Sequence, residues 1–311
     1  FFGWIDYHSG AGGTITAELM IAQSTDGIQF GTPQQVSAVD PDNEFNDRPW
    51  LTLAPDGSMY VSWTNGPANM DGIGARYAQS RDGQPFAPSQ SIFDPHPGEN
   101  ELEESPVAFD ATGSLVAVSS VYGYDPATGQ LAYGINSWRM DAGAWVSAPL
   151  MSLVSEPRFT FETYVELTSD SHGVVSAAFL NGLSRDVTLY VARSSDGART
   201  WSTPARVVGQ RAPASTVTLP WITHDEADRI HLMWLDNRYG NWVPYTAYSS
   251  DGAVFSAPER IGDAQFVEDG ASQRWIGDFT SIIVRQGVRY AVWTDTRSGV
   301  SQVYFSAAPA P

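Results

Sequence analysis

The chain has no cysteine among its 311 residues. This absence excludes disulfide frameworks, thiolate metal sites and cysteine nucleophiles. It has no apolar run of about 18 residues, which excludes an ordinary transmembrane helix. Cations are also scarce, because 17 Lys and Arg residues stand against 35 Asp and Glu, giving a net charge of −18. Such a chain repels nucleic acid and anionic membranes, so we expect neither as a partner.

Signatures of common cofactor sites are missing as well. The five histidines form no H-E-x-x-H motif, and neither a P-loop nor a G-x-S-x-G elbow occurs. We therefore expect no cofactor, with Ca²⁺ as the one candidate ion. The acidic segments "VDPDNEFND" (39–47) and "HPGENELEE" (96–104) are rich in the oxygen ligands that Ca²⁺ prefers. Plain solvated loops are the alternative interpretation of both segments.

One phrase recurs along the chain. "RSSDGARTWSTP" (193–204) has close copies at 23–33, 79–89 and 248–258, and a degenerate copy at 139–149. The copies are 55 to 59 residues apart, a period that is typical of repeat architectures. In an S-x-D-G turn, the Asp side chain accepts backbone N–H bonds and the Gly supplies a positive φ. We therefore interpret five aspartates as structural turn residues: Asp26, Asp82, Asp141, Asp196 and Asp251.

The residues around each phrase predict short antiparallel strands. Residues 46–94 contain four apolar or β-branched runs separated by Asp-Gly turns, which is typical of a four-stranded meander. The second and third strands of this unit recur six times. Trp4, Trp63, Trp234 and Trp293 share one register in the second strand, so we expect them in the core. Radial repetition of such sheets predicts an all-β, six-bladed β-propeller.

We expect a single propeller domain over residues 1–306. The first blade lacks its opening strand, because Phe1 already lies in a second strand, and the last blade ends after its third strand. These assignments give 22 strands. The predicted blades span about 1–42, 46–94, 100–155, 159–210, 214–264 and 270–306, followed by a tail or linker at 307–311.

The S-x-D-G phrases resemble the Asp-box, or BNR, repeat of the sialidase superfamily. The resemblance covers essentially the whole chain. It implies six blades, with a carbohydrate site on the rim opposite the Asp boxes. It also implies an arginine triad for the substrate carboxylate, a Tyr–Glu nucleophile pair and an Asp acid/base. The matching positions are Arg48 in "DRPW", Asp71 in "NMDGIG" and Glu162 in "FETYVEL", with Glu166 further along.

The chain departs from the sialidase pattern at three of these functions. Asn181 and Gly182 occupy the place of the second triad arginine, and the strand "YTAYSS" has no third arginine. Phe279 stands where the resemblance implies the nucleophilic Tyr. We therefore do not expect ordinary exo-sialidase activity.

The residues themselves also predict a polar rim. Glu104, Glu162 and Asp278 begin equivalent strands, and two carboxylates of different pKa are what glycoside hydrolysis requires. Neutralisation of neighbouring arginines is the alternative role. The motifs "LDNR" and "TDTR" place further charges where long loops leave the scaffold. As ligand-binding residues we expect Asp236, Arg238, Arg274, Asp295 and Arg297, although an Asp–Arg pair that braces a loop is the alternative.

These observations leave two functions open. The first is a secreted, sialidase-like glycoside hydrolase with a rearranged site. The second is a non-enzymatic glycan-binding or scaffold domain of a larger extracellular protein. In both cases we expect a bacterial secreted or cell-surface monomer whose partner is carbohydrate.

Overall fold

A computed structural model of the chain describes residues 1–9, 15–37, 44–67, 72–94, 99–101, 105–124, 131–152, 164–183, 186–208, 216–262, 265–267 and 276–311. None of these residues lies in a helix. In this part of the chain, consequently, no helix is long and apolar enough to cross a membrane. The chain divides into two compact units, Phe1–Ser152 (unit 1) and Leu153–Pro311 (unit 2).

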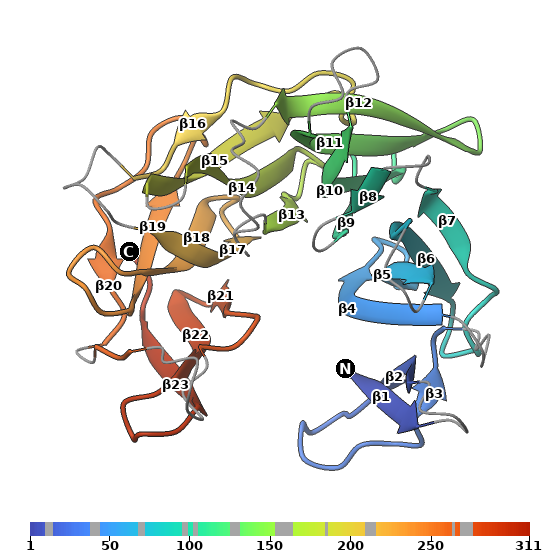
Figure 1. Ribbon diagram of the computed structural model, residues 1–311, viewed down its shortest axis with the longest axis horizontal. Helices are drawn as coiled ribbons and strands as arrows, with labels where there is room; N and C mark the ends of the chain where they lie inside the picture. Colours follow the sequence, from blue (N-terminus) through green and yellow to red (C-terminus); the bar gives the residue numbers. More distant parts are fainter. Residues whose placement is uncertain are drawn as a thin grey trace. The chain divides into compact units, whose positions relative to one another are not determined.

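Unit 1 contains three antiparallel sheets in chain order, the first three blades (Figure 1). Blade 1 has β1 (Phe2–Ser9), β2 (Ile15–Ala22) and β3 (Gln34–Gln35). Blade 2 has β4 (Glu44–Leu53), β5 (Met59–Pro67), β6 (Gly74–Ser80) and β7 (Gln90–Phe93). Blade 3 has β8 (Glu99–Glu101), β9 (Val107–Phe109), β10 (Leu115–Tyr124), β11 (Leu131–Asp141) and β12 (Ala144–Ser152).

Unit 2 also contains three antiparallel sheets, whose strands again follow chain order (Figure 1). Blade 4 has β13 (Val165–Ser169), β14 (Val175–Leu183), β15 (Asp186–Ser194) and β16 (Ala205–Arg206). Blade 5 has β17 (Val217–His224), β18 (Ile230–Asp236), β19 (Val243–Ser249) and β20 (Glu259–Arg260). Blade 6 has β21 (Ser281–Arg285), β22 (Val288–Asp295) and β23 (Gln302–Pro309).

The six successive antiparallel sheets confirm the predicted class, an all-β, six-bladed β-propeller. As predicted, blades 1 and 6 each have three described strands. Blade 3 differs from the prediction, because its opening strand is divided into β8 and β9, which both pair with β10. Pro106 precedes β9 and has no N–H to donate to a ladder, which accounts for an interruption at this point. The described strands therefore number 23 instead of 22.

The end of the chain also differs from the prediction. Residues 307–311, expected as a tail or linker, continue β23 to Pro309, which pairs with Val288. Ala310 N–H then donates to the Gly287 carbonyl at 2.8 Å. Small residues and proline are tolerated on an edge strand, where one row of backbone groups needs no partner. The "AAPAP" segment therefore belongs to blade 6.

The repeated tryptophans lie in the core, as predicted for three of the four. The exposed fractions are 1% for Trp63, 0% for Trp234 and 4% for Trp293, whereas Trp4 is partly exposed. Each buried ring lies on the second strand of its blade, where side chains of neighbouring strands surround it. Truncating a buried aromatic side chain of this size typically costs about 3–5 kcal/mol.

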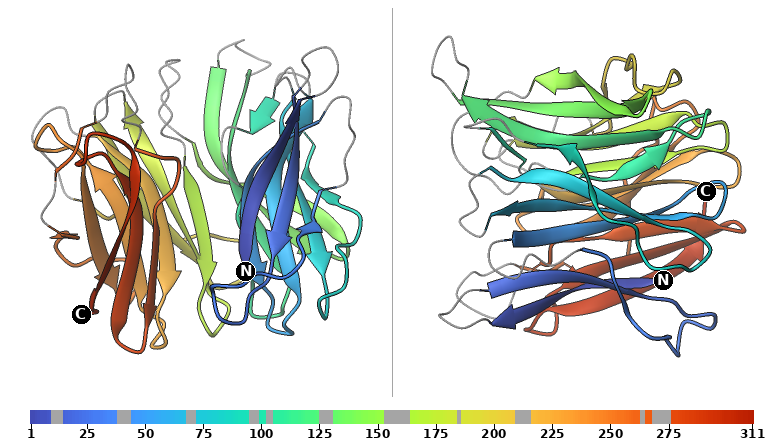
Figure 2. Two further views of the ribbon diagram at one scale, coloured as in Figure 1. Left: turned by 90° about the horizontal axis from the view of Figure 1, so that it is seen from below. Right: turned by 90° about the vertical axis from the view of Figure 1, so that its right-hand side faces the viewer.

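Each complete blade has two rims, which the register of blade 5 defines. Val217 at the start of β17 pairs with Asp236 at the end of β18, and we call this edge the upper rim. Ile230 at the start of β18 pairs with Ser249 at the end of β19, and we call this edge the lower rim. Figure 2 shows the strands of a blade running side by side between these edges. Second-strand ends and S-x-D-G turns therefore occupy opposite rims, as predicted.

Candidate functional site

At the upper rim of blade 5, Asp236 and Arg238 form a tight ion pair. The Asp236 side chain is fully buried, and its Oδ2 accepts hydrogen bonds from Arg238 Nε at 3.0 Å and Nη2 at 2.5 Å. Its Oδ1 accepts the Arg238 backbone N–H at 2.9 Å. The guanidinium also lies over the Tyr245 ring, 4.5 Å from the centroid. Burial lowers the pKa of Arg238, but the hydrogen bonds and charge of Asp236 outweigh it and raise this pKa overall.

Blade 6 repeats the arrangement with Asp295 and Arg297. The buried Asp295 accepts the Arg297 backbone N–H and Nε, both at 2.7 Å, and also Nη2. Arg297 lies over the Tyr304 ring at 4.3 Å. Charge-assisted hydrogen bonds and cation–π contacts thus hold each guanidinium from two sides. We call this repeated set of Asp, Arg and Tyr the Asp–Arg clamp.

The core tryptophans complete each clamp from below. Trp234 Nε1 lies 3.4 Å from Asp236 Oδ2, and Trp293 Nε1 donates to Asp295 Oδ2 at 3.2 Å. The buried carboxylates therefore have donors from their own loop and from the core. Because each carboxylate offsets its guanidinium, the contacts agree with the bracing alternative. A ligand-binding role for these four charged residues stays a prediction.

Exposed aromatic rings and one carboxylate accompany the clamps. Tyr239 follows the first clamp and is 69% exposed, and Phe279 in blade 6 is 42% exposed. Asp278, predicted as catalytic, is partly buried and lies just before β21. A Cβ at the preceding Gly277 would lie 2.5 Å from Thr294 Oγ1, so the backbone beside Asp278 packs closely on β22. The rim of unit 2 therefore combines aromatic surface with fixed polar groups.

The upper rim of blade 2 in unit 1 uses amides in place of the clamp. Asn46 Oδ1 accepts Trp63 Nε1 at 2.8 Å and Asn65 Nδ2 at 2.9 Å. Asn65 Oδ1 accepts Arg76 Nε at 2.9 Å. In blade 1 the equivalent pair is Asp6 and His8, whose Oδ2 and Nε2 atoms are 3.7 Å apart. The clamp chemistry is thus specific to blades 5 and 6 among these blades.

Arg48, the sequence-based match to a triad arginine, lies at a β-bulge within β4. The register of β4 and β5 shifts between Asp47 and Trp50, and Arg48 has a φ of 53°. Leu219 occupies the same bulge in β17, with a φ of 49°. Both positions precede Pro-Trp, so blades 2 and 5 share the same bulge. Arg48 belongs to unit 1, whereas Asp278 and the two clamps belong to unit 2.

Four predicted site residues lie outside the described residues: Asp71, Glu104, Glu162 and Arg274. Most of the two acidic segments proposed for Ca²⁺ lies there too. Glu166, further along from Glu162, is 2% exposed in β13. Among the described residues, no cluster of three His, Asp or Glu side chains is arranged to hold a metal ion.

The S-x-D-G turns at the lower rim have the predicted structural bonds in three copies. Asp196 Oδ1 accepts the Ser194 hydroxyl at 2.8 Å and the Thr200 N–H at 2.9 Å, and its Oδ2 accepts the Thr200 hydroxyl at 2.6 Å. The Thr200 bonds, above all, lower the pKa of Asp196 to about 2. Asp26 and Asp251 each accept two backbone N–H groups and a Ser hydroxyl in the same way.

The other two copies differ from the prediction. Asp82 has a φ of 52°. Its turn is closed by two hydrogen bonds: the Gln84 N–H donates to the Arg81 carbonyl, and the Ser80 hydroxyl donates to the Gln84 carbonyl. Asp141 ends β11, and Ala142 and Gly143 form a two-residue hairpin with φ values of 51° and 84°. Two positive φ values suit the twist of paired strands, so a tight hairpin replaces the turn in which an Asp side chain accepts backbone N–H groups.

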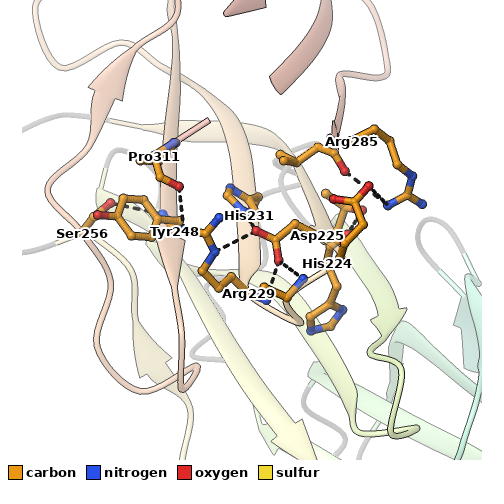
Figure 3. Close-up of polar contacts among 12 residues, drawn as sticks. His224, Asp225, Arg229, His231, Tyr248, Ser256, Arg285 and Pro311 are labelled. Atoms are coloured by element: carbon orange, nitrogen blue, oxygen red, sulfur yellow. Dashed lines mark hydrogen bonds and ion pairs between the residues drawn. The ribbon is translucent and has the colours of Figure 1, made fainter. Parts of the chain in front are cut away.

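A buried polar cluster at the lower rim of blade 5 was not predicted. Figure 3 shows Asp225 between Arg229 and His231; its Oδ2 accepts Arg229 Nε at 2.8 Å and lies 3.0 Å from His231 Nε2. Burial alone would raise the pKa of Asp225, but the His231 bond and those from residues 227 and 229 lower it to about 2. Nearby His224 is buried, and neither ring nitrogen has a hydrogen bond among the described residues.

Comparison with known proteins supports the fold. No protein-family model and no curated protein matches this chain. A protein of unknown function from Dyadobacter fermentans DSM 18053 aligns over 88% of this chain and 82% of its own, with 13% identity and a TM-score of 0.60. An ulvan lyase, described as a new family of polysaccharide lyase, aligns over 95% of this chain and 70% of its own, with 10% identity and a TM-score of 0.56.

A glycoside hydrolase is also similar. The α-L-arabinanase of Penicillium chrysogenum, complexed with arabinobiose, aligns over 88% of this chain and 96% of its own, with 12% identity and a TM-score of 0.50. At such low identity these likenesses concern the fold alone, because one propeller scaffold supports many activities.

Proposed function

We propose that this protein is a carbohydrate-active propeller that binds a polysaccharide at the upper rim of unit 2 and cleaves it. The observation that carries the proposal is the position of two solvent-exposed rings, Tyr239 and Phe279, at the upper rim of blades 5 and 6. Asp278 and the two clamps belong to the same rim of these blades. Aromatic rings cover the apolar faces of sugars, and nearby polar groups satisfy sugar hydroxyls. The folds of a polysaccharide lyase and an arabinanase support the same substrate class.

For the reaction, we propose glycoside hydrolysis with Asp278 as one of two carboxylates. Hydrolysis needs a general acid and a second carboxylate as base or nucleophile. Glu162, which belongs to unit 2 like Asp278, is the sequence-based candidate for that second role, and Asp71 and Glu104 stay sequence-based predictions in unit 1. We retain Arg48 as a binding candidate in unit 1. We also propose that the protein works outside the cell, where polymeric glycans occur.

The sialidase-type assignment is a finer proposal. It rests on the S-x-D-G turns at Asp26, Asp196 and Asp251, in which the carboxylate accepts backbone N–H groups as expected of Asp boxes. Phe279 occupies the place of the expected nucleophilic Tyr, so we expect no release of sialic acid from a simple aryl sialoside. A different substrate, such as an arabinan or an ulvan, suits the propeller likenesses better.

A second candidate function is glycan binding without catalysis. It is favoured by the clamps, whose charges are already paired within each blade. In that case the rim presents aromatic rings and a neutral polar surface, which binds sugar without activating water.

One experiment separates these functions. The protein is incubated with arabinan, ulvan, galactan and sialylated glycans, and three signals are measured: new reducing ends, new unsaturated uronates and retained binding. Reducing ends without unsaturation indicate a hydrolase. Unsaturated ends indicate a lyase and contradict the hydrolase proposal, and binding without product indicates the second candidate. No binding and no product would contradict the carbohydrate assignment itself.

A further inference from the structure

The segment that carries Asp278 and Phe279 lies just outside the sheet of blade 6. The ladder between β21 and β22 begins only at Ser281, so that ladder does not position these two residues on the upper rim. Core side chains flank the segment at Ile276 and Ile282, which are 6% and 0% exposed. The segment is therefore anchored at both ends, and its middle needs a further contact to have one fixed position.

Thr280 supplies that contact by joining the segment to the neighbouring blade. Thr280 is 2% exposed, and its Oγ1 donates a hydrogen bond to the Leu219 carbonyl of blade 5 at 2.8 Å. Leu219 lies at the β17 bulge, where the register with β18 shifts between Thr218 and Trp221. A bulged residue is left out of the ladder, which accounts for a carbonyl that accepts from a side chain of the next blade.

This hydrogen bond connects the two blades that carry the exposed rings of the rim. In blade 5, the bulge lies two residues from the strand pair that contains the clamp carboxylate Asp236, and Tyr239 follows that clamp. In blade 6, Phe279 directly precedes Thr280. Buried polar groups that are hydrogen-bonded make their surroundings rigid. The Thr280 hydroxyl thus fixes Phe279 relative to the rim of blade 5.

We propose that Thr280 is a positioning residue, which holds Phe279 and Asp278 in place relative to Tyr239 so that one glycan chain contacts both blades. The inference rests on the proposed function, because it assigns both rings to one binding site. Thr280 is buried and does not touch the glycan. It acts through Phe279, since a ring that is already ordered loses less entropy on binding. The substrate class is then an oligosaccharide or polysaccharide that spans the two rings, and a single sugar binds poorly.

Blade 4 indicates that valine fits at the position of Thr280. Val165 pairs with Phe179, which takes the register of Trp293, and Thr280 stands in the corresponding place in blade 6. Val165 is 0% exposed, so a buried valine suits this part of a blade. Thr280→Val therefore removes the hydroxyl and keeps the shape of the side chain, whereas Thr280→Ser keeps the hydroxyl.

A matched control comes from unit 1. Thr52 Oγ1 donates to the Val107 carbonyl of the next blade at 2.7 Å, the same kind of bond between blades. Thr52→Val loses this bond in the other unit, away from the proposed site. It should therefore keep wild-type affinity for glycans.

Calorimetric titration with oligosaccharides of arabinan, ulvan and galactan is the test of binding. Thr280→Val should raise the Kd about three- to tenfold, the cost of ordering one more side chain on binding, and Thr280→Ser should restore it. In a Phe279→Ala background, Thr280→Val should cause no further loss, because the hydroxyl acts through that ring. A merely structural role would lower stability without this dependence on Phe279. With wild type, the single sugars should bind on the order of tenfold more weakly than their oligosaccharides.

Three results would overturn the positioning role and leave the proposed function standing. They are equal affinity of Thr280→Val and wild type, fully additive losses in the double variant, and single sugars that bind wild type as tightly as oligosaccharides do. The last of these needs no variant, so it decides the matter even if Thr280→Val does not fold.

Amide hydrogen exchange of the unliganded protein separates this inference from the proposed function. Exchange at Asp278 and Phe279 should be faster in Thr280→Val than in wild type and should return to the wild-type rate in Thr280→Ser. Unchanged exchange would overturn the positioning role without any ligand. Faster exchange in a protein that binds no glycan would instead contradict the proposed function, and with it a glycan as the ligand for which Thr280 orders the rim.

Discussion

Individual polar side chains in this propeller act mainly through fixed partners within their own blade. Asp236 and Asp295 hold their arginines, Asp196 holds its turn, and the Asp225 carboxylate bonds to residues 227, 229 and 231. The sequence predicted Asp236, Asp295 and Asp196 as parts of the repeated D-x-R and S-x-D-G motifs, whereas Asp225 belongs to neither motif and was not predicted. It did not predict Tyr245 and Tyr304, whose positions over the guanidinium depend on strand register. Their common separation of 11 residues from Trp234 and Trp293 was the available signal.

The Asp196 turn is open to a direct stability test. Asp196→Ala removes an acceptor that serves two backbone N–H groups and two hydroxyls, so the free energy of unfolding should fall by about 1–2 kcal/mol. Because the pKa of Asp196 is lowered, its contribution is complete above about pH 4 and decreases as the pH falls toward 2. Urea unfolding measures both effects. The control Asp82→Asn, in an exposed turn without this bonding pattern, should change stability little; an equal loss in both variants would contradict the assignment.

In the Asp–Arg clamp, removing one charge should lower the free energy of unfolding more than Asp196→Ala does. Arg238→Met leaves the fully buried Asp236 carboxylate without its guanidinium, which should cost about 3 kcal/mol. Arg297→Met should behave similarly in blade 6. The exposed Arg199→Met serves as the control and should stay within about 0.5 kcal/mol of wild type. Unchanged melting of Arg238→Met together with lost glycan affinity would show that the arginine binds ligand and braces nothing.

His224 should make the fold sensitive to mild acid. Burial, the largest effect, lowers its pKa from 6.5 to about 4, while Asp170 opposes and Arg193 reinforces that shift. The native state therefore resists protonation that the unfolded chain accepts. Stability is complete above about pH 6.5 and falls between 6.5 and 4 by on the order of 3 kcal/mol.

The variant His224→Phe tests this sensitivity. It keeps the volume and removes the titration, so its unfolding free energy should vary less with pH across that window than that of wild type. Measurements at pH 7.5 give the reference in which neither protein is affected. Parallel pH profiles for the two proteins would show that another group causes the acid sensitivity.

At the scale of strands and turns, repetition made the prediction possible and local exceptions limited it. Second and third strands recur with the same apolar pattern, so their number and order were predictable. The division of the opening strand of blade 3 follows from Pro106, whose effect depends on where the ladder runs. The "AAPAP" end pairs with β22 although its composition indicated a tail. Pairing with a neighbouring strand decides both cases, and composition does not encode it.

The bulge in β4 gives a prediction at this scale. Arg48 has a left-handed backbone, which asparagine tolerates and β-branched residues resist. Arg48→Val should therefore lower the free energy of unfolding by about 1–2 kcal/mol, whereas Arg48→Asn should keep wild-type stability. Glycan affinity of the stable Arg48→Asn variant then reports the guanidinium alone. Equal stability of the two variants would contradict a conformational requirement at the bulge.

For the molecule as a whole, the fold was predictable and the site only in part. The period, the buried tryptophans and the turn phrases all indicate a propeller, and the six sheets agree. The rim was predictable as a location, because second-strand ends fall there in every blade. Which of its charges are paired was not predictable, since burial of Asp236 and the stacking of Arg238 on Tyr245 arise only in the folded blade. These contacts agree with the role that the sequence analysis gave as the alternative, an Asp–Arg pair that braces a loop.

The central claim is that a polysaccharide binds at the upper rim of unit 2, and the affinity of Tyr239→Ala tests it most directly. Tyr239 is 69% exposed, so its removal disturbs little of the fold but takes away an aromatic surface for a sugar ring. Calorimetric titration with oligosaccharides of arabinan and ulvan should give a Kd raised about five- to tenfold relative to wild type. Phe305→Ala, which removes a 64% exposed ring from the face of β23, is the matched control and should bind like wild type. Equal affinity of Tyr239→Ala and wild type, or a loss confined to Phe305→Ala, would contradict binding at this rim.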